Sequence, residues 1–127
     1  MSDAEAVVNA FMAEFDAEHP DPDTLASYFT DDAIYTNMPV DMPAAEGIEA
    51  ISAALQGISQ MTSRGWEVIH SASVGDIVLN ERVDRFVIGG SNVDVEVCGV
   101  FELRDGKIHR WRDYFDMASF QKQMPGG

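Results

Sequence analysis

Apolar residues recur at helical spacing in the first half of the chain and predict three helices. The first follows a cap at Ser2 or Asp3 and ends before His19-Pro20; its apolar positions are Val7, Val8, Phe11 and Phe15. The turn signal Asp21-Pro22-Asp23 predicts a short second helix with an apolar side of Leu25, Tyr28 and Phe29, closed by Asp31-Asp32. The third begins near Gly47 and carries Ile48, Ile51, Leu55 and Ile58.

Beyond the third helix, apolar and polar residues alternate with a period of two, which is typical of strands. Long strands are predicted at 66–73, 77–88, 91–103 and 107–115, joined by turns at Gly75-Asp76, Gly89-Gly90 and Asp105-Gly106. A shorter strand at 33–37 and a loop at 38–43 precede the third helix, and 125–127 forms a loose tail. The pattern predicts an α+β fold in which a curved, mixed or antiparallel sheet, covered by three N-terminal helices, leaves a conical internal pocket.

Length and charge narrow the classes of partner. The chain has 127 residues, so we expect one domain over 1–127. Eight basic against 22 acidic residues leave a formal charge of −14, which disfavours nucleic acids and anionic membrane surfaces as partners. No segment resembles a signal peptide or a membrane span, and the single cysteine, Cys98, favours a reducing cytoplasm.

Candidate chemistry lies on two of the predicted strands. On strand 77–88 the period of two puts Arg82 and Asp84 on the same face, although such a pair alone also fits a solvated polar surface. On strand 107–115 it puts Asp113 between Trp111 and Phe115, on a face that ought to be buried. A buried carboxylate needs a cation or hydrogen-bond donors, and Arg82 is the natural partner if Asp84 and Asp113 come from neighbouring strands.

An uncharged pair completes the candidate site. Tyr35 and Asn37, two apart on the short strand, point to one side and add a phenol and an amide. We expect the pocket walls to include Phe86, Val95, Val97, Phe115, Phe120, Met61 and Ile58, positions that core packing explains equally well.

Four segments resemble limonene-1,2-epoxide hydrolases, in the same order and at similar spacing. They are Glu81-Arg82-Val83-Asp84, Tyr35-Thr36-Asn37-Met38-Pro39, Gly99-Val100-Phe101 and Trp111-Arg112-Asp113-Tyr114-Phe115-Asp116. The resemblance covers nearly the whole chain. It implies the cone-shaped α+β fold of nuclear transport factor 2-like proteins and a homodimeric enzyme without a metal or organic cofactor.

The resemblance also implies a role for each site residue. Asp84 would protonate the epoxide oxygen, Asp113 would deprotonate the attacking water, and Arg82 would bridge the two carboxyl groups. Tyr35 and Asn37 would position the water together with Asp113. The substrates would be a small apolar epoxide and water, and the product a vicinal diol formed without a covalent intermediate.

Two other classes of function fit the same fold. One is an enzyme like ketosteroid isomerase or a polyketide cyclase, in which one Asp shuttles a proton at carbon. The other is a non-catalytic module that binds an apolar small molecule. The chain has no Gly-x-Ser-x-Gly elbow, which argues against a covalent route, and His19, His70 and His109 lack metal-ligand spacing.

Overall fold

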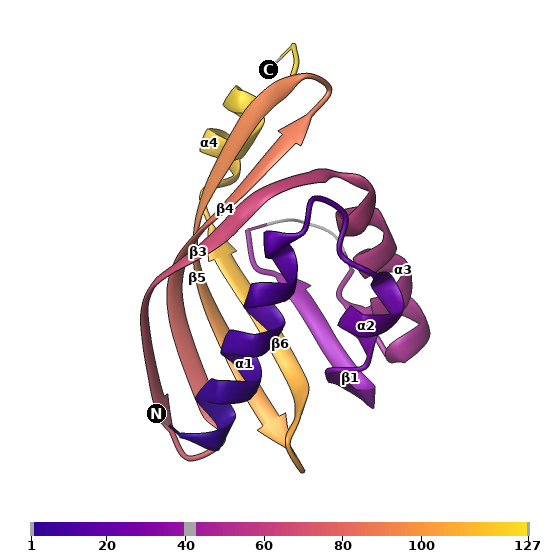
Figure 1. Ribbon diagram of the computed structural model, residues 1–127, viewed down its shortest axis with the longest axis vertical. Helices are drawn as coiled ribbons and strands as arrows, with labels where there is room; N and C mark the ends of the chain where they lie inside the picture. The colour runs from indigo at the N-terminus through magenta and orange to yellow at the C-terminus, as the bar shows by residue number, and fades with distance from the viewer. Residues whose placement is uncertain (1, 40–42, 127) are drawn as a thin grey trace.

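The computed structural model describes residues 2–39 and 43–126 (Figure 1). Helical elements are α1 (Asp3–Ala13), the 3-10 helix η1 (Glu14–Asp16), α2 (Pro22–Ala26), α3 (Ile48–Gln60) and α4 (Met117–Gln123). Strands are β1 (Phe29–Asn37), β2 (Ala45–Glu46), β3 (Thr62–Val74), β4 (Ile77–Ile88), β5 (Ser91–Arg104) and β6 (Lys107–Phe115). The described strands form one mixed sheet in the order β2-β1-β6-β5-β4-β3.

The antiparallel meander β3–β6 forms most of this sheet, and β1 joins it by pairing parallel to β6. Figure 1 shows α1 lying across one face, α2 and α3 beside β1, and α4 beside the far end of the β4–β5 hairpin. The predicted α+β fold with a curved sheet is confirmed, as are the bounds of β4 and β6 and the helix that follows Gly47.

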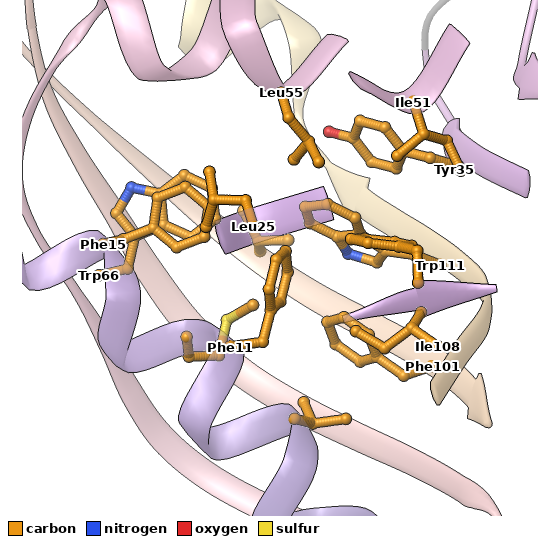
Figure 2. Close-up of a cluster of buried hydrophobic side chains, with 14 of the residues drawn as sticks. Phe11, Phe15, Leu25, Tyr35, Ile51, Leu55, Trp66, Phe101, Ile108 and Trp111 are labelled. Atoms are coloured by element: carbon orange, nitrogen blue, oxygen red, sulfur yellow. The ribbon is translucent and has the colours of Figure 1, made fainter. Parts of the chain in front are cut away.

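An aromatic cluster joins the helical layer to the sheet (Figure 2). Phe11 meets the rings of Phe15, Phe29 and Trp111 edge to face, with centroids 5.3 to 5.5 Å apart. Phe15 stacks on Trp66 of β3 at 3.6 Å between centroids. Such ring pairs add to the free energy gained by burying apolar area, so they fix how α1 and η1 sit on the sheet.

Phe29 was predicted to lie on the second helix and Asp31-Asp32 to close it, and both predictions were wrong. The second helix ends at Ala26, and Phe29 begins β1, fully buried opposite Ile108. The backbone N–H of Ile108 also donates to the carbonyl oxygen of Tyr28 at 2.8 Å. Asp31 and Asp32 lie exposed in β1, at a register shift between Phe29 and Ile34. Pairing with a strand distant in sequence therefore outweighed the local helical spacing.

The expectation of only strands and a tail after α3 was also wrong, because α4 follows β6. The Asp116 carboxylate accepts a hydrogen bond from the backbone N–H of Ala118 at 3.0 Å, which is a helix N-cap. The cap residue Asp116 and the helical spacing of Met117, Phe120 and Met124 indicate a helix in the sequence, and this indication was missed. Strand β3 begins four residues earlier than predicted, at Thr62, and the predicted loop 38–43 has a turn at Met38 and Pro39, with 40–42 outside the described residues.

Candidate active site

Arg82 and Asp84 come from β4 and Asp113 comes from β6. The two acids therefore do not lie on neighbouring strands, which was the condition set for their pairing through Arg82. Strand β5 separates them, and its Gly99 pairs with Asn80 on one side and with Asp113 on the other. A Cβ atom at Gly99 would collide with Nη1 of Arg82 and lie 3.0 Å from Oδ1 of Asp113. The missing side chain at Gly99 therefore leaves the space through which Arg82 reaches across β5.

The guanidinium of Arg82 binds both carboxyl groups. Its Nε and Nη2 donate to Oδ1 and Oδ2 of Asp84 at 2.8 and 3.1 Å, and Nη2 also donates to Oδ2 of Asp113 at 2.5 Å. The remaining nitrogen, Nη1, donates to Oδ1 of Asn80 at 3.0 Å. Every nitrogen of this fully buried cation thus has an acceptor, which offsets the cost of removing it from water.

Asp113 receives a second donor from the aromatic layer. The indole Nε1 of Trp111 donates to its Oδ1 at 2.6 Å. Trp111 is itself fully buried, stacked on Tyr35 at 4.0 Å and on Phe101 at 5.6 Å between ring centroids. Figure 2 shows these three rings close together. The core therefore fixes the orientation of the Asp113 carboxyl group.

Tyr35 and Asn37 stand next to Asp113 because β1 runs parallel to β6. Asn37 pairs in register with Asp113, and Tyr35 with Trp111. The phenol of Tyr35 donates to Oδ1 of Asn37 at 3.0 Å. The amide nitrogen of Asn37 remains a donor, so this pair can hold a small polar molecule beside Asp113.

Burial dominates the titration of the two acids. Desolvation raises the pKa of Asp84 to about 6, although the charge and hydrogen bonds of Arg82 act in the opposite direction. Desolvation likewise raises the pKa of Asp113, again opposed by Arg82 and by the hydrogen bond from Trp111. Two acids that share one cation in a buried site favour a state in which the pair keeps one proton.

A cavity of about 430 Å³ opens next to this polar cluster. Tyr35, Asn37, Asp84 and Asp113 line it, whereas Arg82 lies behind the carboxyl groups. The structure places all seven predicted wall residues around it: Ile58, Met61, Phe86, Val95, Val97, Phe115 and Phe120. Trp66, Ile88, Met117, Gln121 and Met124 also line it. The polar groups therefore lie against a mainly apolar cavity.

Sequence reasoning missed three parts of this site. Asn80 shared a face with Arg82 by the period of two but was not assigned to the site, and Trp111 was seen only as an apolar neighbour of Asp113. Of the wall residues near the C-terminus, Phe120 was predicted, whereas Met117, Gln121 and Met124 were missed together with the helix α4. The spacing of two between Asn80 and Arg82 was the sequence signal that could have identified Asn80 as a partner of the guanidinium.

The histidines take no part in the site. His19 contacts the carbonyl oxygen of Ser59, His70 contacts Glu81 on the surface, and His109 contacts Thr30. Across residues 2–39 and 43–126, no group of three His, Cys, Asp or Glu side chains is arranged to hold a metal ion. Within the same ranges, no helix is long and apolar enough to cross a membrane.

Comparison with known proteins points in the same direction as the geometry. A model of the limonene-1,2-epoxide hydrolase catalytic domain matches residues 2–126. The chain is 38% identical to epoxide hydrolase EphG of Mycobacterium tuberculosis over 126 residues, which are 97% of this chain and 77% of that protein.

Solved structures agree with the match to the limonene-1,2-epoxide hydrolase catalytic domain. The structure of an LEH-like epoxide hydrolase from M. tuberculosis superposes with a TM-score of 0.80 at 32% identity, covering 96% of this chain and 89% of that chain. A SnoaL-like polyketide cyclase structure from Shewanella putrefaciens reaches a TM-score of 0.82 at 15% identity, covering 97% of this chain and 96% of that chain, and shows the shared fold alone. The chain therefore belongs to the limonene-1,2-epoxide hydrolase family.

Proposed function

We propose that this protein adds water to an apolar epoxide in one step, giving a vicinal diol without a covalent intermediate. The observation that carries the proposal is Arg82 bound to both Asp84 and Asp113 beside a mainly apolar cavity of about 430 Å³. An epoxide is strained but has a poor alkoxide leaving group, so its opening needs a proton at oxygen and a proton acceptor at the attacking water.

Asp84 supplies the proton and Asp113 accepts one in the proposed reaction. The raised pKa of Asp84, about 6, increases the fraction of neutral carboxyl group that can donate to the epoxide oxygen, compared with an ordinary Asp. Asp113 lies beside Asn37 and Tyr35, whose polar groups can hold the water that Asp113 activates. Water then attacks the carbon from the side opposite the breaking C–O bond, and both carbons keep all their other bonds.

Arg82 favours a state in which one of the two acids is ionised and the other is protonated. Its positive charge tolerates one ionised carboxylate in the buried site, whereas a second would add an uncompensated charge. Proton transfer at carbon, the alternative reaction on this fold, needs one base and a donor to an oxyanion. A second carboxyl group bound to the same guanidinium would have no part in that reaction, so the geometry favours hydrolysis.

A panel of epoxides in ¹⁸O-labelled water tests the reaction, with Asp84→Asn and Asp113→Asn as variants. We expect diol that carries one label from the first turnover onward and a loss of at least about 100-fold in kcat for each variant. Unlabelled diol in a single turnover would instead indicate attack by a protein oxygen. Absence of diol from every epoxide, or full activity in both variants, would refute the proposal.

Assembly and location follow as further proposals. The outer face of the sheet exposes Ile69, Leu79 and Tyr114, and the homodimers of the family support a second copy of this chain as the occupant of that face. Sedimentation of the native chain against Leu79→Glu tests this, because a charge at the centre of such an interface would give monomers. A cytoplasmic location stays a prediction based on the single, free Cys98.

A further inference from the structure

The helix α4 forms part of the cavity wall and packs on the core through the partly buried side chains of Phe120 and Met124. Met117, Phe120, Gln121 and Met124 line the cavity, and none of the residues of α4 is fully buried. Phe120 contacts the ring of Phe115 at 6.1 Å between centroids. A helix of seven residues has little stability of its own, so its position depends on the contacts at its ends.

At the far end of α4, the side chain of Gln123 binds the backbone of β5. Its Oε1 accepts from the N–H of Asp94 and its Nε2 donates to the carbonyl oxygen of Asp94, both at 2.8 Å. The pairing between β5 and β6 ends at Val97 and Phe115, so Asp94 lies beyond the last residue of β5 that β6 reaches. The primary amide of Gln123 thus takes the place that a peptide group of a longer β6 would occupy.

Two further contacts lie beside the junction between α4 and β5. The carboxylate of Asp94 is paired with Nη1 of Arg64 on β3 at 2.6 Å. Past Gln123, Pro125 lies against the β4–β5 turn, where a Cβ atom at Gly89 would come within 2.8 Å of its Cγ. The end of the chain therefore rests on the same hairpin whose Phe86, Ile88 and Val95 line the cavity.

We propose that Gln123 is a positioning residue that latches α4 onto β5 and thereby sets how tightly the cavity holds the apolar part of its ligand. The hydrogen bonds of the polar cluster join β1, β4 and β6, whereas Gln123 binds β5, so the latch acts on binding and not on the reacting bond. The inference rests on the proposed hydrolysis only for the identity of the ligand.

Gln123→Glu is the sharpest variant because it keeps size and shape. A carboxylate still accepts from the N–H of Asp94, but it repels the carbonyl oxygen of Asp94 and lies near the Asp94 carboxylate. Ala118→Glu is the matched control, since it adds the same charge at an exposed position of α4 that does not line the cavity. Gln123→Ala removes both hydrogen bonds to Asp94, and the weaker one from Nε2 to the carbonyl oxygen of Ser119 at 3.2 Å, without adding charge.

Amide exchange tests the latch directly. The N–H groups of Phe120 and Met124 donate within α4 and its C-terminal cap, so their exchange reports opening of this helix. We expect exchange about tenfold faster in Gln123→Glu and Gln123→Ala than in the native chain, and native rates in Ala118→Glu. Unchanged protection in both Gln123 variants would overturn the latch.

Ligand binding tests its consequence with an unreactive probe. Quenching or enhancement of tryptophan fluorescence by 1-octanol follows occupancy, because Trp66 lines the cavity. We expect the Kd for 1-octanol to rise about tenfold in both Gln123 variants and to stay native in Ala118→Glu. Equal Kd values in all four proteins would overturn the role in binding.

Kinetics then separate this inference from the proposed reaction. For 1,2-epoxyoctane we expect a higher KM with unchanged kcat in Gln123→Glu, and for propylene oxide, whose single methyl group has little apolar surface to bind, a nearly unchanged kcat/KM. A fall in kcat for both epoxides would overturn a role limited to binding. If the native chain opens no epoxide of the panel, the proposed hydrolysis fails, while amide exchange and 1-octanol binding still decide the latch.

Discussion

The arrangement of the candidate site depends on one missing side chain. Gly99 on β5 leaves room for the guanidinium of Arg82 to lie between the two strands that carry the acids. Because Nη1 of Arg82 and Oδ1 of Asp113 crowd this point, even a methyl group there must displace one of them. The geometry of both acids therefore depends on a residue that has no chemistry of its own.

Gly99→Ala should reduce activity far more than it reduces folding. We expect a fall in kcat of at least about 100-fold, because Arg82 can no longer bind both carboxyl groups, and a loss of about 1–3 kcal/mol in the free energy of unfolding. Diol formation and urea unfolding measure the two effects. Gly57→Ala is the control: it lies on an exposed part of α3 with no atom within 4 Å of the added Cβ, and should stabilise by up to about 1 kcal/mol. Native kcat in Gly99→Ala would contradict the steric argument.

The raised pKa of Asp84 makes stability depend on pH with a defined sign. In the folded protein the pKa of Asp84 is about 6, against an ordinary value of 3.8. Between pH 3.8 and about 6 the folded state therefore binds more protons than the unfolded state. The free energy of unfolding of the native chain should therefore fall as pH rises from about 4 to 7, by up to about 3 kcal/mol relative to Asp84→Asn. Urea unfolding of both proteins across this range measures the difference. A difference that is constant with pH would contradict a raised pKa.

At the scale of elements, periodicity predicted those strands and helices whose pattern is local. Strand β4 agrees with the structure because buried positions alternate with less buried ones along most of its length, and β6 shows the same alternation from Trp111 to Tyr114. Phe29 does not, because its partner, Ile108, lies far along the chain and local spacing carries no record of that pairing. The crossing of Arg82 over Gly99 was beyond prediction for the same reason: it depends on three strands meeting in register.

The junction between η1 and β3 offers an element-scale prediction. The hydroxyl of Ser63 donates to the carbonyl oxygen of Phe15 at 2.5 Å, and its N–H donates to the carbonyl oxygen of Glu18 at 2.8 Å. In Ser63→Ala the buried carbonyl oxygen of Phe15 loses the hydroxyl that donates to it. We therefore expect a loss of about 1–3 kcal/mol in the free energy of unfolding. Thermal unfolding measures it, with Ser119→Ala on the exposed side of α4 as the control. Equal melting temperatures in both variants would contradict a role for this hydrogen bond.

At the scale of the whole molecule, the dominant feature is the formal charge of −14. Ion pairs such as Arg64–Asp94 and Arg104–Asp32 lie at the surface, where each contributes little to stability. Repulsion among the remaining carboxylates opposes the compact state and acts over the Debye length, which salt shortens.

Salt should therefore stabilise the fold. We expect the melting temperature to rise as NaCl is increased from about 10 mM to about 0.5 M, because screening relieves more repulsion than it removes from the surface ion pairs. Differential scanning calorimetry at pH 8 measures the change. Potassium chloride serves as the control for a specific effect of sodium, and a fall in melting temperature with both salts would contradict the argument.

Trp66 belongs to two parts of the molecule at once. One face of its indole stacks on Phe15 in the core, and the same side chain lines the cavity. Anyone who repacks η1 or β3 to make the protein more heat-resistant will therefore also reshape the chamber, and anyone who enlarges the chamber at Trp66 will loosen the core. Thermostability and substrate range cannot be engineered independently through this ring, so each must be selected with the other under assay.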